Sequence, residues 1–151
     1  MKYLEVAHFG NNYLFNKNIQ NYQLDVEILA SSIIKKSKKY FLLNQKKKFT
    51  KKEFNRFKKF LKKRNNRQPV AQIINKKEFW KQNLYIDNNV LIPRPESEHI
   101  VEETANLIKD ERNYSILDIG CGSGCLIISI LLDKINCRGT ALDVSKKAIK
   151  V

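Results

Sequence analysis

Hydrophobic residues recur at helical spacing in the first half of the chain. From Leu24 to Ile34, apolar side chains stand at positions 24, 28, 29 and 33, so that one side of a helix could enter a core. We therefore expect a helix over 24–34 that buries this face.

A second helix is predicted to begin after Thr50. The sequence Thr50-Lys-Lys-Glu53 is a capping box, in which each side chain satisfies a free backbone N–H group. Phe54, Phe57 and Leu61 then line one side, and lysines occupy the other. Such a helix suits a small bundle with a basic surface, and it would equally suit an RNA-binding helix.

Beyond Pro69 the pattern changes to short β-prone runs at 78–80, 84–86 and 90–92. Because Asp87-Asn-Asn89 separates two of these runs with turn-forming residues, we expect a hairpin here that links two units. Two prolines then fix an extended path around Arg94, and the acids at 96 and 98 favour the start of a helix over 97–109. Arg94 itself could order a neighbouring loop or contact a substrate.

The segment 114–144 has the pattern of a strand, a glycine loop, a helix and a second strand. Ser115–Ile119 is a short apolar run typical of a buried strand, and Cys125–Leu132 continues as an apolar helix. Arg138–Asp143 follows as the second strand, which completes a βαβ unit with its two strands parallel. Ligands of such units bind at the carboxyl ends of the strands.

The spacing around the glycine loop favours one ligand. The run Asp118-x-Gly120-x-Gly122-x-Gly124 lacks the Gly-Lys-Ser/Thr of a phosphate-binding loop, and Asp118 would repel a pyrophosphate. An acid here suits an ammonium group, and Asp143, 19 residues past Gly124, suits ribose hydroxyls. We therefore expect S-adenosylmethionine; the simpler alternative is that the glycines serve only a tight turn.

Charge divides the chain into two regimes. The formal net charge of +14 lies entirely within residues 1–67, whereas residues 68–151 carry 11 basic and 11 acidic side chains. Within 35–67 there are 16 basic residues and a single acid, Glu53. This bias fits a selected docking face for protein or RNA, and it fits compositional drift toward Lys, Asn and Ile equally well.

Length and composition exclude several classes of protein. A chain of 151 residues suits one domain or two small ones, and no apolar run reaches the roughly 18 residues of a membrane span. The three cysteines, an odd number, give no disulfide framework and no paired zinc spacing, so we expect a cytoplasmic protein without a metal. Cys121 and Cys125 are expected to be small buried thiols beside a turn.

Several of these segments together resemble the HemK/PrmC family of protein-(glutamine-N5) methyltransferases, which modify class 1 peptide-chain release factors. The most specific is Val90-Leu-Ile-Pro-Arg-Pro-Glu-Ser-Glu98, because other class I methyltransferases share the glycine loop. The other matching segments are Leu24-Asp-Val-Glu-Ile-Leu29, Gln68-Pro-Val-Ala71, Glu78-Phe-Trp80, Leu117-Asp-Ile-Gly-Cys-Gly-Ser-Gly-Cys125 and Ala141-Leu-Asp-Val-Ser145.

The resemblance implies an α/β protein with three parts. These are a small basic helical bundle over 1–67 that docks the release factor, a β-hairpin linker over 68–96, and a truncated Rossmann-like methyltransferase domain over 97–151. The residues expected to bind S-adenosylmethionine are Asp118, Gly120, Cys121, Gly122, Ser123, Gly124 and Asp143.

The chain also departs from the family. The Asn-Pro-Pro-Tyr motif that holds the glutamine amide is absent, since the only prolines are Pro69, Pro93 and Pro95. Methyl transfer needs the amide nitrogen held in line with the methyl group, so we name no catalytic residue and expect this polypeptide alone to be inactive. The alternative function is a non-catalytic module that binds RNA or the ribosome through Lys35–Arg67.

Overall fold

The computed structural model describes residues 1–109 and 112–151, which form two compact units. Unit 1 comprises Met1–Ile74 and unit 2 comprises Asn75–Val151. The fold is α/β overall, with a helical bundle followed by a mixed region with two small sheets. The finer division at residues 67 and 96 stays a prediction. No helix within the described residues is both long and apolar enough to cross a membrane.

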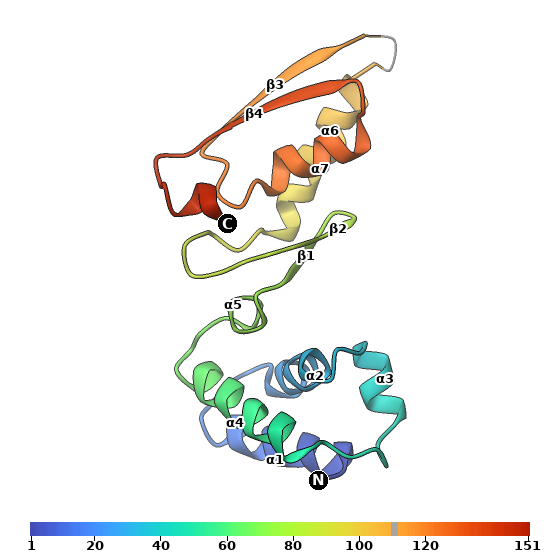
Figure 1. Ribbon diagram of the computed structural model, residues 1–151, viewed down its shortest axis with the longest axis vertical. Coiled ribbons are helices and arrows are strands. Elements are labelled where there is room, and N and C mark those ends of the chain that lie inside the picture. Colours follow the sequence, from blue (N-terminus) through green and yellow to red (C-terminus); the bar gives the residue numbers. More distant parts are fainter. Residues whose placement is uncertain (110–111) are drawn as a thin grey trace. The chain divides into compact units, whose positions relative to one another are not determined.

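Unit 1 is built from five helices (Figure 1). They are α1 (Tyr3–Phe15), α2 (Tyr22–Ile33), α3 (Lys38–Leu43), α4 (Lys51–Asn65) and α5 (Val70–Ile74). Helix α2 lies at the centre of this bundle, because it contacts each of the other four. The side chains of Leu14, Leu29, Phe41 and Phe57 are fully buried in its core.

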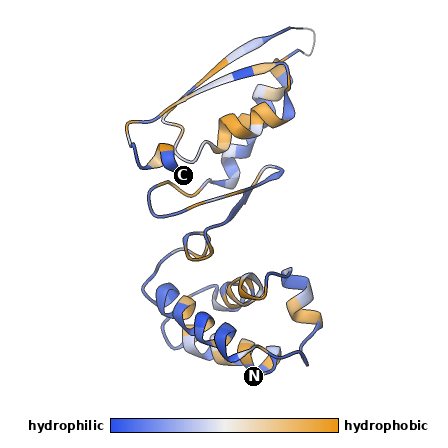
Figure 2. Ribbon diagram, viewed as in Figure 1, coloured by the Kyte–Doolittle hydropathy of each residue, from blue (hydrophilic) through white to orange (hydrophobic). Residues whose placement is uncertain are grey.

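Helix α4 confirms the predicted capping box. The Thr50 side chain accepts a hydrogen bond from the Glu53 N–H, and the Glu53 carboxylate accepts one from the Thr50 N–H. Phe57 and Leu61 are buried and Phe54 is half-buried, as their spacing predicts. Figure 2 shows the resulting division of α4 into a hydrophobic stripe and a hydrophilic remainder.

The predicted helix over 24–34 is confirmed, but its predicted inward face is partly wrong. Leu24 is 45% exposed, and the fully buried positions include Val26 and Leu29. The buried apolar residues, at 26, 29, 30 and 33, themselves form a helical stripe, rotated from the one that the sequence suggested. The buried face of α2 is set by tertiary packing, because the four other helices of unit 1 contact α2 and cover these residues.

Unit 2 contains a two-stranded antiparallel sheet and a two-stranded parallel sheet. Its elements are β1 (Lys77–Phe79), β2 (Gln82–Leu84), η1 (Pro95–Ser97), α6 (Glu98–Leu107), β3 (Tyr114–Ile119), α7 (Cys125–Asp133), β4 (Cys137–Leu142) and η2 (Ala148–Lys150). Helix α7 contacts both β3 and β4, and α6 packs against α7 (Figure 1).

A hairpin is present, but the prediction placed its turn wrongly. Strands β1 and β2 pair antiparallel with Phe79 opposite Gln82, so the turn lies at 80–81 rather than at 87–89. Asp87–Asn89 does form a turn, in which the Asn89 N–H donates to the Asp87 carboxylate, yet no strand pairs across it. Ile86 and Val90, which flank this turn, are buried in the core of unit 2. This segment is therefore held by side-chain packing and not by strand pairing.

The βαβ pattern is confirmed. Strands β3 and β4 run parallel and α7 connects them, with Asp118 opposite Ala141 in the register. One detail of the prediction is wrong, because β3 is not buried on both faces: Leu117 and Ile119 are 57% and 78% exposed. Burial alternates along β3, since α7 covers only one face of the sheet.

Candidate cofactor-binding site

The candidate site lies where β3 and β4 end side by side. Ile119 is opposite Leu142 at the last position of the ladder, so the glycine loop after β3 and the residues after β4 leave the sheet at the same edge. Parallel pairing therefore brings together Asp118, the loop and Asp143, which are up to 25 positions apart in the sequence.

The loop requires glycine at three positions. Gly120, Gly122 and Gly124 have φ angles of 83°, 56° and 72°, in the left-handed region that side chains disfavour. A Cβ atom at Gly120 or Gly122 would meet no atom within 4 Å, whereas at Gly124 it would lie 3.0 Å from Ile128 Cδ1. The first two glycines thus serve the backbone turn and leave open space beside it.

Most of the N–H groups in this loop are engaged within the protein. The Gly120 and Cys121 N–H groups both donate to the Leu142 carbonyl, at 2.7 and 3.0 Å, and the Gly124 N–H donates to the Cys121 carbonyl. The Gly122 N–H donates to Asp143. A phosphate-binding loop needs such groups free to point at the ligand, so this geometry does not suit a pyrophosphate.

Asp143 is held by two backbone donors. The Gly122 N–H lies 2.9 Å from its Oδ2 atom, and the Ser145 N–H lies 2.8 Å from its Oδ1 atom. Hydrogen bonds from Ser145 first, and then from Gly122, hold the pKa of this carboxyl below its usual range. The ionised carboxylate only accepts hydrogen bonds, and each oxygen retains a lone pair for a further donor.

Asp118 carries an unsatisfied oxygen. Its Oδ2 atom is buried and has no hydrogen-bond partner among the residues that the structure describes. A buried oxygen without a donor is costly, so a ligand that brings a cationic N–H group would stabilise this position.

The thiols beside the loop do not have the environment of reactive cysteines. Burial raises the pKa of Cys121, and the charges of Asp118 and Asp143 raise it further. Burial likewise raises the pKa of Cys125. Both thiols are therefore protonated at neutral pH.

Ser123 and Arg94 are the remaining positions that the sequence singled out. Ser123 lies half-buried in the loop, and Arg94 is exposed at the start of η1, where both of its suggested roles stay predictions. No group of three metal-ligating side chains occurs within the described residues.

Sequence reasoning missed the hydrogen bond between Gly122 and Asp143, which ties the loop to the next strand. It also missed Ser145. Its hydroxyl accepts a hydrogen bond from the Ala148 N–H at the start of η2. The spacing Asp143-x-Ser145 is a signal that could have found the local turn, because an aspartate often accepts from the backbone two residues on.

Comparisons with known proteins identify both parts of the chain. A family profile for the PrmC N-terminal domain matches residues 5–74. The release factor glutamine methyltransferase of Buchnera aphidicola subsp. Schizaphis graminum is 33% identical over 147 residues, which cover 93% of this chain and 53% of that protein.

Two further release factor glutamine methyltransferases are similar. That of Coxiella burnetii is 35% identical over 85% of this chain and 47% of its own length, and that of Caulobacter vibrioides is 39% identical over 61% and 32%. The chain spans about half the length of the Buchnera and Coxiella proteins and 32% of the length of the Caulobacter protein. By these matches, the chain belongs to the PrmC/HemK family of release factor glutamine methyltransferases, of which it covers roughly the N-terminal half.

Proposed function

We propose that unit 2 supplies the S-adenosylmethionine-binding edge of a release factor glutamine methyltransferase. The observation that supports this most directly is a pair of carboxylates at an open glycine loop: Asp118, just before the loop, has an unpartnered buried oxygen, and Asp143 accepts a hydrogen bond from Gly122 within it. Dinucleotide sites place a phosphate at such a loop, whereas these two acids suit a ligand with one cationic group and one ribose.

The residues fit this ligand group by group. The unpartnered Asp118 oxygen would accept from the methionine ammonium, and Asp143 would accept from the ribose hydroxyls while its backbone donors hold it in place. The space beside Gly120 and Gly122 would admit the body of the ligand. When bound, S-adenosylmethionine supplies an electrophilic methyl group.

Unit 1 is proposed to dock the release factor. The match of residues 5–74 to the PrmC N-terminal domain supports this role. The acceptor in our proposal is a glutamine side-chain amide. The 151 residues contain no Asn-Pro-Pro-Tyr sequence, so no residue described here is assigned to holding that amide.

Calorimetric titration of the full chain with S-adenosylhomocysteine tests the binding site. We expect saturable binding that weakens at least tenfold in Asp118→Asn and in Asp143→Asn, because each variant removes one charged acceptor. Glu102→Gln is the matched control, since Glu102 is an exposed acid of unit 2 on α6. Absence of binding by the wild-type chain, or equal affinity for NAD, would refute the proposal.

A second assay separates binding from catalysis. With radiolabelled S-adenosylmethionine and a class 1 release factor, we expect the 151-residue polypeptide alone to transfer no methyl group, because its sequence lacks the Asn-Pro-Pro-Tyr motif expected to orient the amide. Stoichiometric methylation would show that the orienting groups lie among these residues after all.

A further inference from the structure

Unit 1 carries an exposed cationic surface that the methyltransferase proposal does not use. It runs from Lys36, two residues before α3, through the α3–α4 loop to the first turn of α4. We call it the basic surface, and its lysines, all exposed, are Lys36, Lys39, Lys46, Lys47, Lys48, Lys51 and Lys52.

These seven lysines have no acidic partner within the described residues. The only acid in the segment, Glu53, is engaged by the backbone and hydroxyl groups of Thr50. The ion pairs of the described part of unit 1 involve other cations, namely Lys38 with Glu27 at 3.7 Å and Arg64 with Asp25 at 2.6 Å. No lysine of the basic surface is ion-paired in the described structure, and Glu53 is the single negative charge of the segment, so a large excess of positive charge remains.

An aromatic ring lies within this surface. The Lys36 and Lys47 ammonium groups lie 5.7 and 5.0 Å from the centre of the half-buried Tyr40 ring. The Lys47 ammonium also donates to the Tyr40 hydroxyl. Cations held beside an aromatic face are the combination that nucleic-acid-binding surfaces use for phosphates and bases.

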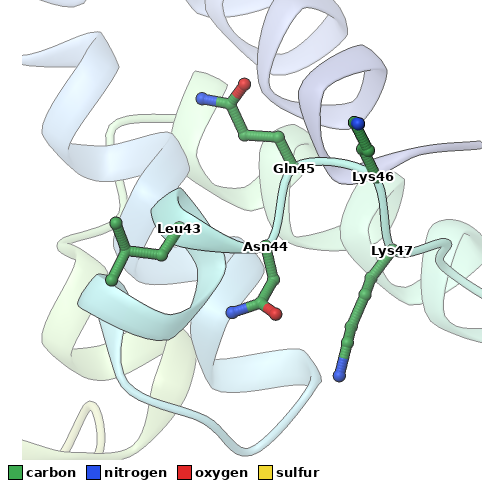
Figure 3. Close-up of a pocket in the computed structure, with 5 residues that line it drawn as sticks. All are labelled: Leu43, Asn44, Gln45, Lys46 and Lys47. Carbon is green, nitrogen blue, oxygen red and sulfur yellow. The ribbon is translucent and has the colours of Figure 1, made fainter.

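The α3–α4 loop adds polar and apolar groups. A shallow depression here is lined by Leu43, Asn44, Gln45, Lys46 and Lys47. Figure 3 shows Asn44 and Lys47 projecting to one side of the loop and Gln45 to the other. Leu43 is 73% exposed beside them, so amides and an apolar contact are available between the ammonium groups.

The charge density favours a nucleic acid over an acidic protein as the partner. Within 17 residues, seven ammonium groups have no carboxylate partner in the described structure, and this density matches a strand that carries one phosphate per nucleotide. On an acidic protein surface, neutral and basic side chains would dilute the negative charge. A half-exposed tyrosine can stack only on an unpaired base. We propose that the basic surface binds single-stranded RNA, independently of the glycine loop.

Fluorescence anisotropy of a labelled oligouridine with the full chain tests this proposal over a range of salt concentrations. The test variant replaces Lys46, Lys47, Lys48, Lys51 and Lys52 with glutamine. The matched control replaces five exposed lysines elsewhere, Lys17, Lys76, Lys109, Lys146 and Lys150, and so removes the same net charge. Circular dichroism verifies that both variants remain helical.

We expect the affinity of the test variant to fall at least tenfold at moderate salt. The plot of log K against log salt should become less steep, by up to about 3.5 in the magnitude of its slope. This corresponds to about 0.7 for each phosphate that a lysine no longer neutralises. The affinity of the control variant should fall less than threefold. Equal reductions in the two variants would mean that net charge alone attracts the RNA, and the proposal would be wrong.

Two further measurements address the kind of partner. Tyr40→Leu should weaken oligouridine binding by about fivefold or more, because the ring on which a base stacks is removed. A polyglutamate peptide of the same charge should compete poorly. Effective competition by polyglutamate would assign the surface to an acidic protein and overturn the RNA proposal.

Discussion

The glycines of unit 2 illustrate two different reasons for lacking a side chain. Gly122 has a left-handed backbone in open space, whereas at Gly139 of β4 a Cβ atom would lie 2.7 Å from Leu131 Cδ1 and 2.8 Å from Ile127 Cδ1 of α7. The first is needed by the turn, and the second lets the helix approach the sheet.

Alanine at these two positions should therefore have distinguishable effects. Gly122→Ala should lower stability by about 1 kcal/mol through backbone strain and should also weaken S-adenosylhomocysteine binding. Gly139→Ala should lower stability by about 1–3 kcal/mol through overpacking. Denaturant titration gives the stability change and calorimetry the affinity. An unchanged affinity in Gly122→Ala would argue that the loop conformation is not needed for binding.

The hydrogen bonds at Asp143 predict a dependence on pH. Since its pKa is lowered in the folded state, the stabilisation from these bonds is present above the usual aspartate pKa of about 3.9 and is lost as pH falls through the lower folded value. In NMR titrations, the Gly122 amide shift should follow this protonation. The response should vanish in Asp143→Asn, and persistence there would assign it to another acid.

At the scale of elements, the β1–β2 turn connects to both helices of unit 2. The Trp80 indole N–H donates to Asp133 at the end of α7, 2.7 Å away, and the Lys81 ammonium lies 3.0 Å from the same carboxylate. The Trp80 backbone N–H donates to Glu98 at the start of α6. These contacts explain why the hairpin turns at 80–81.

Asp133→Asn should release this turn in part. The hydrogen bond of Lys81 lowers the pKa of Asp133 most, so removal of the charge eliminates the ion pair and weakens the hydrogen bond from the indole. We expect a decrease of about 1–2 kcal/mol in the stability of unit 2. Emission from the single tryptophan reports the change, and Glu102→Gln should leave it unaltered. An unchanged spectrum in Asp133→Asn would contradict the assigned hydrogen bond.

Local signals predicted α2, α4, α6, β3, α7 and β4, whereas α1, α3 and α5 were not predicted and the hairpin was decided by long-range contacts. The Thr50–Glu53 capping box and the glycine loop were readable because their chemistry lies within a few residues. The hairpin was misplaced because its turn depends on Glu98 and Asp133, 18 and 53 positions from Trp80. For the candidate site, the residue types were predictable from spacing, but the bond between Gly122 and Asp143 needs the strands to be paired.

At the scale of the whole chain, the two units have separate hydrophobic cores. The core of unit 1 draws its buried residues from positions up to 73, and that of unit 2 from position 79 onward. Unit 2 has an exposed apolar sheet face, since Leu117, Ile119 and Leu142 of its parallel sheet are more than half exposed. Separate cores should unfold separately.

We expect two transitions on thermal or denaturant unfolding of the full chain. Far-ultraviolet circular dichroism is dominated by the helices of unit 1, whereas Trp80 emission reports unit 2, so the two signals should change at different midpoints. The exposed sheet residues should bind a hydrophobic dye before either transition, and Ile119→Lys should reduce that signal. Coincident midpoints would mean that the two cores unfold as one.

The hydrogen bond from Gly122 to Asp143 couples ligand binding to the folding of unit 2. Because Asp143 reaches the loop only when β4 is paired with β3, a ligand that needs this carboxylate binds only the folded form of unit 2. By mass action, such a ligand at 100 times its Kd adds about 2.7 kcal/mol to the stability of the unit that holds it. For a small unit with one sheet face exposed, the cellular supply of the ligand would then set how much of unit 2 is folded.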